Sequence, residues 1–197
     1  MTDVTLDSVN KIAIKYSLEK VTESTVRSVF GLNKEESSQK FFPNLKLEEA
    51  LKLMDEFEDL KLETLKERGG NIYPNTESIL KELSKEYELF IVSNTARNEY
   101  IESFITQLDY EKYFKDYVAA SLLGVSKGDA IKKVVETNNL ERAVYVGDTK
   151  KDLEAASLAG IPFIQARYGF GEELQTEYYI NDIVELPNVV ENIKFIK

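Results

Sequence analysis

Three groups of polar residues carry the side chains that phosphate chemistry needs. The first is Ser93-Asn94, the second is Lys127, and the third is Asp148 with Asp152 in the run V-G-D-T-K-K-D. A hydroxyl, an amide and an ammonium group can bind phosphoryl oxygens, and carboxylates are ligands that Mg²⁺ accepts. The spacing of four places the two carboxylates about one helical turn apart, on one face. The set predicts a magnesium-dependent phosphoryl-transfer site.

Each group taken alone has a simpler interpretation. Ser93 and Asn94 are good helix caps, Lys127 resembles a solvated surface lysine, and Asp148 could cap the helix that follows it. However, a lysine at a helix start opposes the helix dipole, and two nearby acids repel unless a cation lies close to them. The combination therefore favours a site over three unrelated surface features.

Composition excludes several other kinds of chemistry. The 197 residues contain no cysteine and no histidine, which excludes disulfides, thiolate catalysis, Ser-His-Asp hydrolysis and metal sites built on these side chains. A formal net charge of -10 argues against nucleic acid as a partner. No apolar run is long enough to span a membrane and no signal peptide is recognisable, so we expect a cytoplasmic protein.

Residues 1–70 have the pattern of a helical domain. A helix starting near Thr2, a short helix over Ser24–Phe30 and a longer one over Leu47–Leu65 are expected from the spacing of their apolar residues. Gly69-Gly70 then interrupts the pattern and predicts a boundary between residues 1–70 and 71–197.

Residues 71–197 alternate between short apolar runs and helical stretches. The expected strands are Leu89–Val92, Tyr117–Ala120, Ala143–Val146, Pro162–Ile164 and a weaker Ile183-Val184, and the expected helices cover 76–85, 97–107, 128–138 and 150–159. This alternation predicts an α/β fold, in which a parallel sheet lies between two helical layers. Ligands bind such sheets at the carboxyl ends of the strands, where the three polar groups lie.

These motifs, in this order, resemble those of the haloacid dehalogenase-like hydrolase superfamily. Its second motif resembles Ser93-Asn94, its third Lys127, and its fourth Gly147-Asp148 with Asp152. The segment I-Y-P-N at 72–75 is similar to the start of the family's core, and A-R-Y-G-F-G-E-E-L at 166–174 to a loop of phosphoglycolate phosphatase-like members. The resemblance covers essentially the whole chain.

The resemblance implies a three-layer Rossmann-like core with an α-helical cap, formed here mainly by residues 1–70. It further implies a Mg²⁺-dependent phosphatase of a small phosphorylated metabolite, with phosphoglycolate as one candidate. In this family Ser93 and Asn94 would hold the phosphoryl group and Lys127 would stabilise its charge. Asp148 would bind Mg²⁺, and Asp152 would support the metal directly or through another group.

The family's first motif is not visible in this sequence. Members begin with a strand ending in D-x-D-G-T-L, whose first Asp is the nucleophile that forms an aspartyl-phosphate. The segment Asp3–Ser8 could be a decayed copy, but too few residues precede it for a strand, so we favour a cap helix there. We therefore expect the core to lack its N-terminal central strand, which should leave an apolar groove with an unpaired strand edge on each side.

Two rival functions stay open at this point. A non-catalytic binding or regulatory protein, or an inactive fragment, would also have this sequence if the nucleophile is truly absent. A dinucleotide-binding fold is less favoured, since no G-x-G-x-x-G follows a first strand. The sequence predicts neither the exact substrate nor the oligomeric state.

Overall fold

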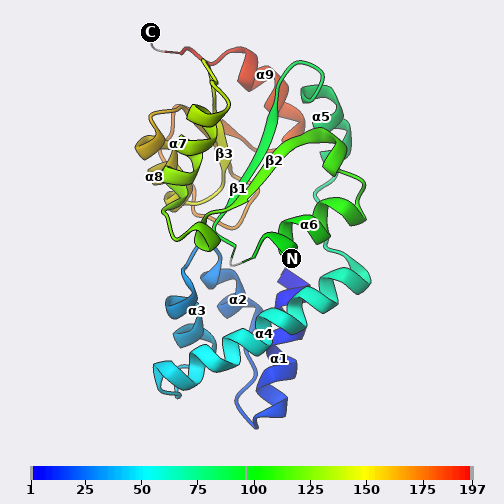
Figure 1. Ribbon diagram of the computed structural model, residues 1–197, viewed down its shortest axis with the longest axis vertical. Helices are drawn as coiled ribbons and strands as arrows, with labels where there is room; N and C mark the ends of the chain where they lie inside the picture. The colour runs from blue at the N-terminus through cyan, green and yellow to red at the C-terminus, as the bar shows by residue number, and fades with distance from the viewer. Residues whose placement is uncertain (1, 96, 196–197) are drawn as a thin grey trace. The chain divides into compact units, whose positions relative to one another are not determined.

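The computed structural model describes residues 2–95 and 97–195. The chain divides into two compact units (Figure 1). One contains residues 1–71 and 99–109, and the other contains residues 72–98 and 110–197. The predicted boundary near residue 70 lies beside this division, whereas residues 99–109 were expected in the second unit. That residues 1–70 act as a cap remains a prediction.

The first unit is all helical. Its helices are α1 (Thr2–Lys15), α2 (Glu23–Val29), α3 (Lys34–Phe41), α4 (Leu47–Arg68) and α6 (Asn98–Gln107). Helix α4 contacts both α1 and α3, and their apolar faces form the core, which includes Val9, Ile12, Val26, Phe41, Met54 and Phe57. Helix α6 joins this unit through Tyr100, whose hydroxyl group donates a hydrogen bond to the Glu58 carbonyl.

Two features of this unit bear on the sequence analysis. Residues Asp3–Ser8 lie inside α1, so this segment is helical, as we favoured. Helix α3 was not expected, because few of its residues are apolar. It is held instead by a capping box in which Asn33 and Glu36 each accept a hydrogen bond from the other's backbone N–H group.

The second unit is an α/β domain. Its elements are α5 (Thr76–Leu83), β1 (Leu89–Ser93), η1 (Glu111–Tyr113), β2 (Phe114–Ala119), η2 (Ala120–Leu123), α7 (Lys127–Thr137), β3 (Tyr145–Gly147), α8 (Lys150–Ala159), β4 (Phe163–Ala166), β5 (Tyr178–Ile180), η3 (Ile183–Glu185) and α9 (Leu186–Glu191). Every strand pairing is parallel. Helices α7 and α8 pack together on one side of the strands, and α5 packs with α9 on the other (Figure 1). The predicted three-layer α/β fold is therefore confirmed.

The prediction of a strand at Ile183-Val184 was wrong. These residues form the 3₁₀ helix η3, in which the Asp182 side chain accepts a hydrogen bond from the Val184 N–H group. A proline in the first turn of α9 follows at once. The last strand is β5, three residues further upstream, which pairs with β4.

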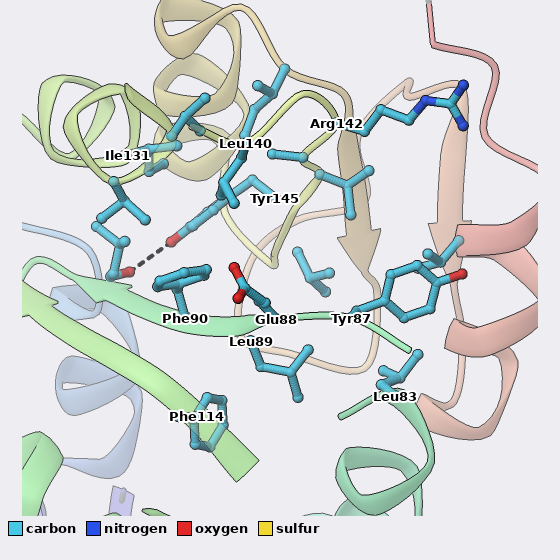
Figure 2. A pocket seen from close by; sticks show the side chains of 18 of the residues that line it. Leu83, Tyr87, Glu88, Leu89, Phe90, Phe114, Ile131, Leu140, Arg142 and Tyr145 are labelled. Carbon is cyan, nitrogen blue, oxygen red and sulfur yellow. Dashed lines mark hydrogen bonds between the residues drawn. The ribbon is translucent and has the colours of Figure 1, made fainter. Parts of the chain in front are cut away.

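The strands form two sheets rather than one. Strand β1 pairs with β2, and β3 pairs with β4, which pairs with β5. Strands β1 and β3 both line an apolar cavity of about 470 Å³ (Figure 2). The groove expected from a missing central strand is therefore present in the second unit.

None of the helices in the described part of the chain has both the length and the hydrophobicity needed to cross a membrane.

Candidate active site

Lys127 and Asp152 form an enclosed ion pair in the α/β unit. Ser126 caps α7 by accepting a hydrogen bond from the Asp129 N–H group, which makes Lys127 the first residue of that helix. The Nζ atom of Lys127 lies 2.6 Å from Oδ1 of Asp152, and the side chains of Lys127 and Asp152 are 12% and 6% exposed. The alternative of a solvated surface lysine therefore does not describe Lys127.

The second carboxylate oxygen of Asp152 binds the turn that leads into α8. Oδ2 accepts hydrogen bonds from the Thr149 hydroxyl group at 2.7 Å, the Thr149 N–H group at 3.0 Å and the Asp148 N–H group at 3.3 Å. Burial alone would raise the pKa of Asp152, but the charge and hydrogen bond of Lys127 and the two hydrogen bonds from Thr149 outweigh it and lower the pKa. Asp152 is thus held ionised, with both oxygens engaged.

Asp148 lies between β3 and α8, against the loop at 167–174. Its Oδ2 atom accepts a hydrogen bond of 2.6 Å from the Phe170 N–H group. A Cβ atom at Gly171 would overlap the Asp148 carbonyl oxygen, so this position requires glycine. The N-cap of α8 is Thr149, not Asp148, so capping does not explain the Asp148 carboxylate.

Gln165 holds the loop at 167–174 through side-chain hydrogen bonds. It is fully buried in β4, and its amide group donates to the Glu172 carbonyl at 2.7 Å and to the Asp148 carbonyl at 3.4 Å. Its Oε1 atom accepts a hydrogen bond from the Leu174 N–H group at 2.9 Å. One side chain therefore connects Asp148 to the loop that covers it, and no motif in the sequence identified it.

Ser93 is the last residue of β1, and Asn94 begins the turn that follows it. The Ser93 Oγ atom accepts a hydrogen bond from the Thr95 N–H group at 3.3 Å, and the Asn94 carbonyl accepts one from the Ser121 hydroxyl at 2.9 Å. Helix α6 begins only at Asn98, so neither residue caps it. The turn after β1 is thus tied to the segment after β2 and presents a hydroxyl and an amide side chain.

Tyr145 connects the two halves of the site. Its hydroxyl group donates a hydrogen bond of 2.9 Å to the carbonyl of Val92, the residue before Ser93, and Nζ of Lys127 lies 6.0 Å from its ring centroid. Burial raises the pKa of Tyr145 far above its usual value, and the charge of Asp152 adds to the shift. The hydroxyl therefore stays protonated and donates. The sequence analysis did not single out Tyr145, because a tyrosine in an apolar strand usually belongs to the hydrophobic core.

The carboxylates of Asp148 and Asp152 are of the kind that binds Mg²⁺, but they do not surround a metal position on their own. Within residues 2–95 and 97–195, no three acidic side chains are grouped so that they could hold a metal ion. Asp148 and Asp152 are the two acids that the motif contributes, and both Asp152 oxygens already accept hydrogen bonds. Mg²⁺ commonly binds through one or two carboxylates plus waters and phosphate oxygens, and the Asp148 carboxylate fits that pattern.

Several solved structures resemble this chain. A haloacid dehalogenase-like family hydrolase from Streptococcus pneumoniae is 20% identical, with a TM-score of 0.80 over 95% of this chain and 90% of that one. A predicted phosphatase from Clostridium acetobutylicum is 21% identical, with a TM-score of 0.80 over 98% and 92% of the two chains. A predicted phosphoglycolate phosphatase from Haemophilus somnus 129PT is 19% identical, with a TM-score of 0.81 over 96% and 91%. At these identities the likeness establishes the fold.

No curated protein sequence matches the chain. The family model for haloacid dehalogenase-like hydrolases matches residues 1–166, which is most of its length. That span includes Ser93, Lys127, Asp148 and Asp152, and the fold agrees with it. The chain therefore belongs to the haloacid dehalogenase-like hydrolase family.

Proposed function

We propose that this chain forms the phosphate- and magnesium-binding part of a phosphatase acting on a small phosphorylated metabolite, with phosphoglycolate as one candidate substrate. The observation that carries the proposal is the connected set of Lys127, Asp152 and Asp148 beside the end of β3. An enclosed lysine whose position is fixed by a carboxylate is suited to binding an anion at a defined place.

Each residue has a role in this proposal. The Ser93 hydroxyl and the Asn94 amide donate hydrogen bonds to phosphoryl oxygens. Lys127 has three N–H donors, and the one directed at Asp152 leaves two for the phosphoryl group. Asp152 positions Lys127 and the Asp148 backbone rather than contacting substrate, because both of its oxygens are engaged.

Asp148 is the residue proposed to hold Mg²⁺, which would neutralise charge on the phosphoryl group when bound. The attack on phosphorus is proposed to come from a further carboxylate, and among the described residues no third acidic side chain is grouped with others into a set that could hold a metal ion. We propose that the reaction passes through an aspartyl-phosphate on a strand that the described residues do not contain. We further propose that residues 1–70 act as a cap that selects the substrate, and that the protein is cytoplasmic.

Phosphate binding tests the proposal on the chain as it stands. Calorimetric titration with inorganic phosphate should show binding that tightens when Mg²⁺ is added. Ser93→Ala and Lys127→Met should each weaken binding with and without the metal, because these groups contact the phosphoryl oxygens directly. Unchanged binding in both variants, in proteins that remain folded, would reject the assignment.

A non-catalytic binding protein is the second candidate, and the fact that no three acidic side chains of the described residues form a group that could hold a metal ion favours it. The two are separated by measuring hydrolysis of p-nitrophenyl phosphate with Mg²⁺. The comparison is between this chain and a form extended upstream by an apolar strand ending in D-x-D-G-T-L. Turnover that appears only in the extended form supports the phosphatase, and phosphate binding without turnover in either form supports the binding protein.

A further inference from the structure

The side-chain amine of Lys61, in the helical unit, lies against two aromatic rings. Its Nζ atom is 4.8 Å from the ring centroid of Tyr100 on α6 and 5.8 Å from that of Phe57, one turn earlier on α4. Both ring residues are buried, with exposed fractions of 5% and 4%. Among the described residues no hydrogen bond acts on the amine, and Glu58 supplies the one charge that does.

The Glu58 side chain is paired with a different lysine. Its Oε2 atom lies 3.1 Å from Nζ of Lys34, and the same Nζ atom lies 2.6 Å from Oδ1 of Asp55. The Glu58 carbonyl, in turn, accepts the hydrogen bond of the Tyr100 hydroxyl group. Within the described part of the chain, Lys61 therefore has an acid nearby but no ion pair of its own.

This environment favours the neutral form of the Lys61 amine. Removing an ammonium group from water is costly without a hydrogen-bonded counter-ion, and the faces of aromatic rings offset only part of that cost. Burial lowers the pKa of Lys61 to about 8, although the charge of Glu58 acts in the opposite direction. At pH 7.5, roughly a quarter of such an amine is neutral, against about one in a thousand for a free lysine.

The neutral amine is the nucleophilic form, and lysines in apolar surroundings are activated in this way. Lys61 is only partly buried, so a small reagent can reach it. Lys34 is the contrast in the same unit, because it is also partly buried. Burial would lower the pKa of Lys34, but its hydrogen bonds to Asp55 and Glu58 outweigh burial and raise the pKa. Lys34 therefore stays charged and unreactive.

An acyl group on Nζ of Lys61 suits these surroundings. The amide is neutral, so acylation removes a charge that lacks an ion-pair partner, and the acyl methyl group adds apolar surface beside Tyr100 and Phe57. With an acyl phosphate as donor, the nitrogen lone pair attacks the carbonyl carbon. An N–C bond forms, the C–O bond to phosphate breaks, inorganic phosphate leaves and the amine proton passes to water.

We propose that Lys61 is an acylation site, which small acyl phosphates modify in preference to Lys34 and to the exposed lysines, and that the acyl group stabilises the packing of α6 on α4. The site lies wholly within the helical unit. The inference does not depend on the phosphatase reaction.

Acetylation of the intact chain by acetyl phosphate tests the proposal. Peptide mapping by mass spectrometry gives the initial rate at each lysine. At pH 7.5, we expect Lys61 to react at least about fivefold faster than Lys34 and than Lys52, an exposed lysine paired with Glu48. The rate at Lys61 should level off above about pH 9, whereas the rate at an ordinary exposed lysine keeps rising through about pH 10.

Urea unfolding tests the effect of the modification. A chain with acetyllysine incorporated at position 61 should have a urea midpoint about 0.5–1 M higher at pH 7, because no charge is then held against the rings. Acetyllysine at position 52 is the control. It removes a charge from an exposed ion pair and should leave the midpoint unchanged.

Four results would overturn the proposal. Equal initial rates at Lys61 and Lys34 would show that the missing ion pair does not activate the amine. A rate at Lys61 that rises in parallel with that at Lys52 through pH 10 would show an ordinary lysine. Acetylation of Lys61 in concentrated urea but not in the folded chain would show that the rings close the amine to the reagent. A lower urea midpoint with acetyllysine at position 61 would show that the acyl group does not fit against the rings.

Discussion

Lys127 and Asp152 tie the first residue of α7 to the first turn of α8 through a single ion pair. The Nζ–Oδ1 distance is 2.6 Å, and Oδ2 of the same carboxylate accepts hydrogen bonds from the turn that positions Asp148. The pair therefore links the proposed phosphate-binding cation to the proposed metal ligand. It also places two charges where water reaches them poorly, so neither partner is easily removed alone.

Asp152→Asn should destabilise the protein by about 3 kcal/mol, because an enclosed lysine is then left without its counter-charge. Lys127→Met should cost a similar amount. The double variant should cost clearly less than the sum of the two, measured as a coupling in urea unfolding. Lys52→Met, which removes the exposed ion pair with Glu48, is the control and should change stability by less than about 0.5 kcal/mol. Additive effects at Lys127 and Asp152 would contradict an energetic role for the pair.

The same carboxylate should make stability depend on pH in acid. The pKa of Asp152 is lowered in the folded protein, so its contribution is present above the unfolded value of about 3.9 and is lost as the pH falls through the lower folded value. The difference in urea midpoint between the parent chain and Asp152→Asn should therefore be constant from about pH 7 to 5 and shrink below about pH 4. A difference that persists undiminished at pH 3 would contradict this assignment.

Asp148→Asn should abolish the effect of Mg²⁺ on phosphate binding while leaving metal-free phosphate binding measurable. The amide keeps the shape of the side chain but removes the charge that a hard cation requires. Glu154→Gln is the matched control, because it removes one negative charge from the exposed face of α8. If the two variants respond to Mg²⁺ alike, Asp148 is not the metal ligand.

The order of helices and strands was predictable from the sequence because the local residue pattern of each of these elements agrees with its place in the fold. The starts of α5, α7 and α8 lie within one residue of those expected, and helix caps such as Ser126 and Thr149 are strong local signals. Ile183-Val184 was misread because two adjacent β-branched residues favour a strand by propensity. The hydrogen bond to Asp182 and the proline at 187 override that preference.

The candidate residues were predictable as a set, but their connections were not. Lys127 and Asp152 are 25 residues apart in the chain, and no local rule pairs them. Gln165 and Tyr145 were missed for the same reason, because their polar atoms act on backbone groups of other segments. The apolar cavity, in contrast, was expected from the family resemblance, and strands β1 and β3 line it.

Lys61 of the helical unit should make stability rise with pH in the alkaline range, as Asp152 does in acid. Its Nζ atom lies 4.8 Å from the ring centroid of Tyr100, and burial lowers its pKa to about 8 despite the charge of Glu58. The free lysine titrates near 10.4, so stability should rise as the pH increases from about 8 to 10. Lys61→Met should stabilise the protein at pH 7 by about 1–2 kcal/mol, and the gain should shrink above pH 8. A pH-independent gain, or one matched by Lys66→Met, would contradict an effect of the partly buried Lys61 charge.

Gly171→Ala should weaken phosphate binding in the presence of Mg²⁺ by at least about tenfold, although residue 171 carries no functional group. The added Cβ atom would overlap the Asp148 carbonyl oxygen, which is backbone and cannot rotate away, so the loop or the Asp148 turn must move. Gly160→Ala is the control. Its φ of 70° makes alanine cost about 1–2 kcal/mol of stability, but no atom lies within 4 Å of the new methyl group. Titration calorimetry and urea unfolding on both variants separate the two effects. Equal binding in Gly171→Ala and the parent chain would show that the loop at 167–174 does not set the position of Asp148.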